Sequence, residues 1–352
     1  TTLFRSLQGL MWPKSPEILA KAAFDHNIPF VLSTVTTASI EKIAEITEGN
    51  AWFQLYHPAE ERVTKDILKR AEAAECPVLV ILADVPSFGY RPRDIRNGLS
   101  MPPKMTLTNI INAAKRPHWS LQTLINGQPS FEILKPYMPK NLNLSQLAKF
   151  MDATFSGRLN EEKIKKIRDM WKGKLVLKGA ELVHDVEKAY QLGLDGVIIS
   201  NHGGRQVDVG QATVDSLKNI APLYKDKLTI MMDSGIRGGA DVARVMATGA
   251  DFSFMGRTFM YGVSALGKKG GNHTIAMLKQ QLTQIMEQLS CGQIKDFQDK
   301  IVIGFIGTFG AWHGAEVLAE AYGLLLQKHP DYKDTLRLLL IGDGQKMPLV
   351  KD

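Results

Sequence analysis

The apolar run Gly196-Val197-Ile198-Ile199 passes directly into the polar, glycine-rich stretch Ser200-Asn201-His202-Gly203-Gly204-Arg205-Gln206. A strand that ends in such a turn is typical of the rim of an α/β barrel, where catalytic groups collect on the loops that follow the strands. His202 can accept a proton near neutral pH, and Arg205 can hold a carboxylate through two parallel hydrogen bonds. The pairing favours chemistry on a small organic acid.

The rest of the chain repeats this alternation of short apolar runs with segments of helical period. Seven runs predict strands, at residues 29–32, 52–56, 78–83, 175–178, 196–200, 228–233 and 252–255. Predicted helices lie between them, for example 15–26, with Pro16 in the first turn. The order predicts parallel strands joined by crossover helices, an α/β fold. A closed (βα)₈ TIM barrel needs eight strands, and the stretch before Ser15 is too short for another, so we expect a barrel that lacks its first strand.

A different pattern begins after Asp299. The apolar segment 301–310, a helix that opens near Gly314 and the apolar segment 336–341 predict one Rossmann-like βαβ unit. We therefore expect two domains, a barrel over residues 1–299 and a βαβ unit over residues 300–352. A glycine-rich turn before a helix can receive a diphosphate on its backbone N–H groups, but a unit that only adds a packing layer is an equally open interpretation.

The length, composition and charge limit the classes of protein to which this chain can belong. A chain of 352 residues, 44% hydrophobic and 22% charged, is long enough for a barrel of about 250 residues and a further unit. Two cysteines, Cys76 and Cys291, are too few for a disulfide framework or a zinc site and fit a reducing compartment. The net charge of +7 comes from dispersed Lys and Arg residues without a nucleic-acid motif, so we expect a solvated basic surface and no nucleic-acid partner.

Two kinds of segment that would indicate a membrane or secreted location are not seen in the sequence. No apolar run approaches the roughly 20 residues that a membrane-spanning helix needs. The first residues, Thr1 to Arg5, lack the charged-then-apolar order of a signal peptide. We expect a cytoplasmic protein, with peripheral attachment to a membrane left open.

The stretch from Ser200 to Gln206 resembles the active-site signature of the FMN-dependent 2-hydroxy-acid oxidase and dehydrogenase family, which includes glycolate oxidase and the flavin-linked L-lactate dehydrogenases. The resemblance extends over about residues 7–299. It implies an FMN-dependent oxidoreductase that converts an L-2-hydroxy acid, most simply L-lactate, into the 2-oxo acid. It leaves open which molecule reoxidises the flavin and whether the chain forms a homo-oligomer.

The resemblance also implies roles for residues at the strand ends. His202 is expected to remove a proton from the substrate, while Asp84 orients the imidazole and stabilises its charged form. Arg91 and Arg205 are expected to bind the substrate carboxylate, for which the planar guanidinium is well suited, and Tyr56 to bond the substrate hydroxyl. The alternatives are a turn cap for Asp84, a surface ion pair for either arginine and core packing for Tyr56.

A second set of residues is expected to hold FMN. Gln54 shares a strand face with Tyr56 and would reach the flavin ring. Lys178 would lie near flavin N1 and the C2 carbonyl, where negative charge accumulates on reduction. Ser33 and Thr34 would contact the ring edge, with a simple strand-end turn as the alternative. The loops after the last two strands would hold the ribityl chain and phosphate through Asp233, Gly235, Arg237, Gly256 and Arg257.

The connection over residues 84–150, rich in Pro and Met, is interpreted as a lid over the active site, with a surface loop as the alternative. Some features depart from the family. Its N-terminal tyrosine has no counterpart, and Leu82 stands where many members have a threonine. Two rival functions stay open. One is a non-catalytic or degenerate phosphate-binding barrel. The other is a transferase fragment, because residues 300–352 resemble the start of the nucleotide-sugar-binding domain of retaining glycosyltransferases with two Rossmann-like lobes.

Overall fold

The computed structural model describes residues 2–4, 9–86, 96, 106–127, 129–140, 142, 144–155, 158–299, 301–306, 309–310, 314–333, 335–341, 344–346 and 348–351. The chain divides into two compact units, and each is described by itself. The first contains residues 1–238 and 249–277, and the second contains residues 239–248 and 278–352.

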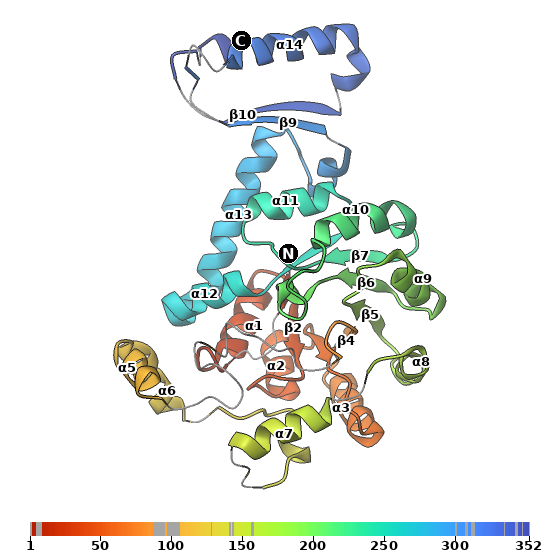
Figure 1. Cartoon of the computed structure of the whole chain (residues 1–352), viewed down its shortest axis with the longest axis vertical. Helices are drawn as coiled ribbons and strands as arrows, with labels where there is room; N and C mark the ends of the chain where they lie inside the picture. Colours follow the sequence, from red (N-terminus) through yellow and green to blue (C-terminus); the bar gives the residue numbers. More distant parts are fainter. Residues whose placement is uncertain are drawn as a thin grey trace. The chain divides into compact units, whose positions relative to one another are not determined.

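The first unit is a closed barrel of parallel strands in which neighbours in the sequence are neighbours in space. Figure 1 shows the strands curling around a common interior with helices outside them. The strands are β1 (Thr2–Phe4), β2 (Phe30–Ser33), β3 (Trp52–Leu55), β4 (Val78–Leu82), β5 (Lys174–Lys178), β6 (Gly196–Ile199), β7 (Thr229–Met232) and β8 (Phe252–Met255). The predicted α/β barrel and its seven predicted strands are thereby confirmed.

The expected gap at the first strand is closed. Residues Thr2–Phe4 pair in parallel with β2 on one side and with β8 on the other, so that Leu3 lies opposite both Phe30 and Met255. The expectation that this position lacks a strand is therefore corrected. Three residues are too few to show an alternating pattern, and both pairing partners are distant in the sequence. Closure matters because an open barrel would expose two edges of unpaired backbone.

Helices cover the outside of the barrel after the strands. They are α1 (Ser15–Asp25), α2 (Ile40–Thr47), α3 (Glu61–Ala73), α8 (Glu161–Met170), α9 (Val183–Gln191), α10 (Thr213–Tyr224) and α12 (Arg257–Leu266). Side-chain caps begin two of them, because Ser39 accepts a hydrogen bond from Lys42 N and Asn160 accepts one from Lys163 N. The long connection between β4 and α8 contains α5 (Leu107–Ala114), α6 (Pro117–Asn126) and α7 (Leu144–Thr154).

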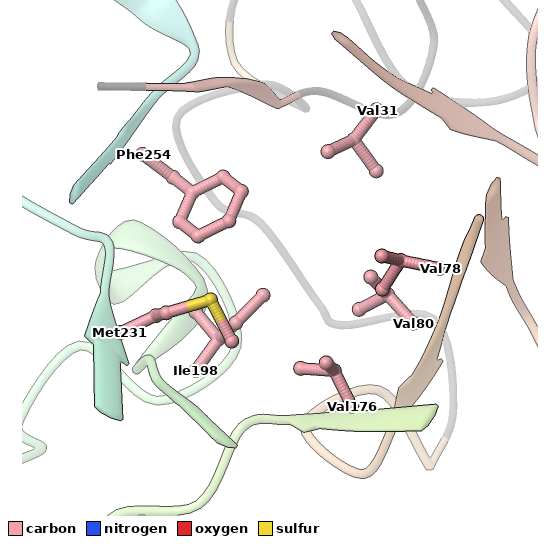
Figure 2. Close-up of a cluster of buried hydrophobic side chains, with 7 residues drawn as sticks. All are labelled: Val31, Val78, Val80, Val176, Ile198, Met231 and Phe254. Atoms are coloured by element: carbon pink, nitrogen blue, oxygen red, sulfur yellow. The ribbon is translucent and has the colours of Figure 1, made fainter. Parts of the chain in front are cut away.

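The barrel interior is filled by a layer of buried apolar side chains, shown in Figure 2: Val31, Val78, Val80, Val176, Ile198, Met231 and Phe254. Side chains two positions apart on a strand share a face. The positions two residues after this layer, and after Trp52, which packs against it, are therefore also inward: Ser33, Gln54, Leu82, Lys178, Ser200, Asp233 and Gly256. All of these except Leu82 and Gly256 are polar. The alternation of the strands thus places a polar layer on an apolar floor.

The second unit contains the predicted βαβ arrangement. Strands β9 (Ile301–Ile306) and β10 (Leu336–Ile341) pair in parallel over six positions, with α14 (Ala315–Lys328) between them in the chain. Helix α11 (Gly239–Ala247), the end of α13 (Gly270–Gln288) and the short α15 (Pro348–Lys351) belong to this unit as well. The domain division at residue 299 and the likeness to a glycosyltransferase remain predictions. In the described part of the chain, no helix has the length and apolar character that crossing a membrane requires.

We expect Phe254→Ala to lower the free energy of unfolding by about 3–5 kcal/mol, because the ring is buried in the apolar layer and its removal leaves a cavity. Urea denaturation followed by circular dichroism measures the change. Phe252→Ala is the matched control on the same strand. Its side chain is 39% exposed, and its removal should cost less than about 1 kcal/mol. Equal losses in the two variants would contradict this account of the core.

Candidate active site

A buried ammonium group lies at the centre of the polar layer. Lys178 ends β5 with only 1% of its surface exposed. Its Nζ lies 2.6 Å from Asp84 Oδ2, 2.7 Å from Ser200 Oγ and 3.5 Å from Asp233 Oδ2. A buried charge is costly unless opposite charges and hydrogen bonds surround it, and the ends of β4, β6 and β7 supply them. The carboxylates of Asp233 and Asp84 outweigh burial, so the pKa of Lys178 is raised and the group stays charged.

Asp84 is the ionised partner of this lysine. Burial by itself raises the pKa of the Asp84 carboxyl, but the Lys178 charge and a hydrogen bond with His202 outweigh that effect and lower it to about 2. The oxygen Oδ2 accepts hydrogen bonds from Lys178 and, at 3.3 Å, from Ser200 Oγ. The other oxygen, Oδ1, is buried and has no hydrogen-bond partner among the described residues.

His202 lies beside this carboxylate. Its Nδ1 is 3.2 Å from Asp84 Oδ2, and its backbone N–H donates to Ser200 Oγ at 3.1 Å. Because the carboxylate is ionised and can only accept, Nδ1 carries the proton of the neutral ring and Nε2 is left to accept another. The backbone of His202 has a φ of 55°, a left-handed conformation that is uncommon outside glycine. The predicted base and its predicted orienting carboxylate are therefore brought together.

A cavity of about 230 Å³ opens beside His202 at the carboxyl ends of β5 to β8. It brings together eight residues predicted to bind substrate or FMN, or to act in catalysis: Lys178, His202, Arg205, Asp233, Gly235, Arg237, Gly256 and Arg257. Four of them, Lys178, Arg205, Arg237 and Arg257, carry a cationic side chain, and a fifth, His202, carries one that can become cationic. The cavity is thus suited to an anionic ligand.

One end of this cavity has the features of a phosphate site. Gly235 has a φ of 79°, and no atom lies within 4 Å of the position that a Cβ would occupy, so the backbone is open to a ligand. Helix α12 begins at Arg257, and its first turn lines the cavity through Arg257 and Thr258. Arg257 Nη2 also donates to Gly203 O at 3.3 Å, which joins the start of α12 to the loop of residues 200–206. Helix N-termini and arginine side chains both favour phosphate.

Gln54 provides a separate indication of a bound group. Its side chain is fully buried on β3, and neither the amide nitrogen nor the amide oxygen has a hydrogen-bond partner in the described part of the chain. Leaving both atoms of a buried amide unsatisfied is costly. A flavin ring, whose edge carries both donors and acceptors, fits this requirement.

Other predicted residues have structural contacts that the sequence did not reveal. Thr34 Oγ1 donates to Gln54 O at 2.8 Å and accepts from Tyr56 N at 3.1 Å, so this hydroxyl ties β2 to β3. Ser33 Oγ accepts from Val35 N at 3.3 Å, the strand-end turn that was the open alternative. The ring of Tyr56 packs edge-on against Phe155, with 5.7 Å between centroids.

Tyr56 and Phe155 also line a second, smaller cavity of about 10 Å³. Arg91 lies outside the described residues, and so does the Pro- and Met-rich stretch 101–105 of the predicted lid.

Two serines of the site carry no role predicted from the sequence. Ser200 contacts three of the polar groups described above, and Ser234 Oγ accepts from Gly203 N and donates to Asp233 Oδ1. The inward alternation of β6 is the signal that could have identified Ser200, because it lies two positions after the inward Ile198.

Comparisons with known proteins agree with this geometry. Residues 5–303 match the family described as FMN-dependent dehydrogenase. The L-lactate dehydrogenase of Bartonella tribocorum (strain CIP 105476 / IBS 506) is 36% identical over 291 residues, which are 82% of this chain and 76% of the relative. That of Haemophilus influenzae (strain PittEE) is 32% identical over 295 residues, 83% of this chain and 77% of the relative.

Solved structures of a dehydrogenase and an oxidase also resemble this chain. The monotopic membrane protein (S)-mandelate dehydrogenase superposes with a TM-score of 0.78 at 32% identity, over 84% of this chain and 78% of that chain. A mandelate oxidase superposes with a TM-score of 0.69 at 27% identity, over 84% of this chain and 77% of that chain.

We expect Lys178→Met to lower the free energy of unfolding at pH 7 by about 3–5 kcal/mol, because two buried carboxylates lose the charge between them. Chemical denaturation measures the loss. Lys174→Met is the control at the other end of β5. That side chain is 71% exposed and pairs with Asp195, so its removal should cost about 0–1 kcal/mol.

The same variant should change the response to acid. The carboxyl of Asp84 has its pKa lowered from 3.8 to about 2 on folding, so it contributes stability above pH 3.8 that is lost as the pH falls toward 2. Without Lys178 the pKa of Asp84 rises, and the unfolding free energy should fall less steeply over this interval. Parallel acid curves for Lys178→Met and the unaltered protein would contradict the assigned ion pair.

Proposed function

Because the chain belongs to the FMN-dependent dehydrogenase family, we propose that it oxidises an L-2-hydroxy acid, and L-lactate in particular, to the corresponding 2-oxo acid. The observation that carries the proposal is the contact between His202 Nδ1 and the ionised Asp84, beside a cavity that Arg205 also lines. It combines a base, its orienting carboxylate and a group that binds carboxylates at the end of one barrel.

FMN, when bound, supplies the acceptor for the two electrons that leave the substrate. In the proposed arrangement, Gln54 bonds the ring edge, Asp233 bonds the ribityl hydroxyls, and Arg237, Arg257 and the backbone at Gly235 hold the phosphate. Lys178 places a fixed positive charge near the part of the ring that becomes negative on reduction. Its surroundings support this role, because the Asp84 and Asp233 carboxylates keep the ammonium charged.

His202 Nε2 takes the proton that leaves the substrate as the α-carbon is oxidised. The carboxylate of Asp84 then stabilises the resulting imidazolium, and it stays ionised because its own pKa is near 2. Arg205 binds the substrate carboxylate through two hydrogen bonds, with Arg91 proposed as its partner. Tyr56 is proposed to bond the substrate hydroxyl.

The size of the space beside Tyr56 supports a small substrate. The cavity there is about 10 Å³, and Leu82, Val85, Pro86, Phe155 and Leu159 are among the residues that line it. This volume is about that of one water molecule. A methyl substituent, as in L-lactate, fits such a space more readily than a phenyl ring does.

We expect anaerobic L-lactate to bleach the visible flavin spectrum of the FMN-loaded protein, and His202→Ala to slow the bleaching by about 10²–10⁴-fold, because the general base is lost. D-lactate is the control for stereochemistry, and His184→Ala is the matched control for a histidine on the exposed face of α9. The absence of flavin even after FMN is added would instead favour the degenerate barrel. Binding of a nucleoside diphosphate that does not depend on His202 would favour the transferase fragment.

We also propose that the protein attaches peripherally to a membrane through α5 and α6. Neither helix buries a residue, and together they expose six large apolar side chains by 45–79%: Leu107, Ile110, Ile111, Leu121, Leu124 and Ile125. Residues 95–131 contain Lys and Arg but no Asp or Glu. An exposed apolar helix face within a stretch of sequence whose only charges are basic suits an anionic lipid surface.

Helix α6 is held to the barrel unit by contacts with the N-terminal loop. Trp119 Nε1 donates to Met11 O at 2.8 Å, and the rings of Trp12 and His118 lie 5.2 Å apart. The structural relative named as a monotopic membrane protein supports the same proposal.

We expect the triple variant Leu121→Ser, Leu124→Ser, Ile125→Ser to lose most of its sedimentation with vesicles that contain phosphatidylglycerol, because the apolar face of α6 is removed. The control replaces three exposed apolar residues elsewhere on the barrel unit, Leu182, Val183 and Leu223, by serine. Equal sedimentation of the two triple variants would refute the assigned surface. The flavin content of both should stay unchanged.

A further inference from the structure

We propose that Ser200 is a positioning residue for the reaction, acting on His202 through its backbone and through Asp84. The inference rests on the proposed function, in which His202 is the base. Ser200 follows β6 with 1% of its surface exposed. It does not line the cavity, so it acts through other groups and not on the substrate.

The hydrogen bonds of Ser200 use the whole capacity of a hydroxyl. The oxygen accepts from Lys178 Nζ at 2.7 Å and from His202 N at 3.1 Å, and it donates to Asp84 Oδ2 at 3.3 Å. A serine hydroxyl offers one donor and two acceptor positions, and all three are occupied here. The direction of each bond is therefore fixed, with Lys178 and the backbone donating and Asp84 accepting.

Through these bonds the Ser200 oxygen contacts the His202 backbone directly and the His202 imidazole indirectly, by way of Asp84. The bond to the backbone N–H helps to hold His202 in its left-handed conformation, which costs free energy and persists only where the surroundings impose it. The bond to Asp84 reaches the same oxygen that faces His202 Nδ1. Ser200 thus positions the backbone from which the His202 side chain extends, and it also positions the carboxylate to which the imidazole bonds.

The rest of the loop is fixed by other groups. Asn201 Oδ1 accepts from Gly204 N, and Asn201 Nδ2 donates to Gln211 O, both at 3.1 Å. Loss of the Ser200 hydroxyl should therefore leave the glycine turn in place and loosen His202 itself. In Ser200→Ala two buried donors, one on Lys178 and one on the His202 backbone, lose their acceptor.

The test compares Ser200→Ala with Ser200→Thr, which keeps the hydroxyl, and with Ser200→Cys, whose thiol is a weak donor and acceptor. Ser15→Ala is the matched control, because Ser15 is also fully buried and also accepts from a backbone N–H, that of Gly9. Each FMN-loaded protein is mixed anaerobically with L-lactate, and the limiting rate of flavin bleaching and the half-saturating concentration are measured by stopped flow.

We expect the limiting rate to fall about 10- to 100-fold in Ser200→Ala, as a misplaced catalytic group would cause. The half-saturating concentration should change less than threefold, because Arg205 is untouched. Ser200→Thr should restore most of the rate, Ser200→Cys should be intermediate, and Ser15→Ala should match the unaltered protein. A rate in Ser200→Ala within twofold of the unaltered protein would overturn the proposal, and so would a Ser200→Thr rate as low as that of Ser200→Ala.

A second readout does not depend on turnover. The ¹⁵N resonance of His202 Nδ1, assigned by comparison with His202→Asn, reports the hydrogen bond to Asp84. It should shift in Ser200→Ala and return in Ser200→Thr. If L-lactate and other 2-hydroxy acids fail to bleach the unaltered protein while this resonance behaves as expected, the proposed function fails and the positioning role stands. An unchanged resonance in Ser200→Ala would refute the positioning role in either case.

Discussion

The structure depends on one constraint, the burial of a positive charge inside the barrel. The Lys178 ammonium has almost no contact with solvent, and it is tolerated because the carboxylates of Asp84 and Asp233 lie within 3.5 Å of it. These three side chains come from the ends of β5, β4 and β7. The barrel must bring these strand ends together, since any one of the groups left alone at this depth would carry a large desolvation cost.

The same cluster determines the chemistry that the site can perform. Lys178 holds Asp84 ionised, and the ionised carboxylate dictates which nitrogen of His202 carries the proton. Ser200 joins all three groups through one hydroxyl. The electrostatic requirement of the fold therefore also positions the proposed base at the mouth of the barrel, beside a cavity that arginine side chains make attractive to anions. The residues that stabilise the buried charge are also those proposed to act in catalysis, so substitutions here should affect both stability and activity.

The connection after β4 contains both a residue of the proposed active site and the two helices proposed to bind a membrane. It starts next to Asp84 and goes on to carry α5 and α6, whose apolar side chains are exposed. The barrel strands bury their apolar residues in a continuous layer, so this exposed face is not a continuation of the core. Insertions between strand and helix are the part of a barrel that can take on such a role without disturbing the closed sheet.

The sequence by itself determined the seven longer strands, the parallel α/β order, the C-terminal βαβ unit and the pairing of His202 with Arg205 in one loop. Each of these follows from a pattern that is local to the chain, such as alternation or a strand followed by a polar turn. Only the tertiary structure shows that Thr2–Phe4 closes the barrel, that the Thr34 hydroxyl joins β2 to β3, and that the side-chain amide of Gln54 is buried without a hydrogen-bond partner in the described part of the chain. It also reveals the hydrogen bonds of Ser200 on which its proposed positioning role rests. The physical reason is distance along the chain: the bond between His202 and Asp84 joins residues 118 positions apart, and only closure of the barrel brings such residues within reach.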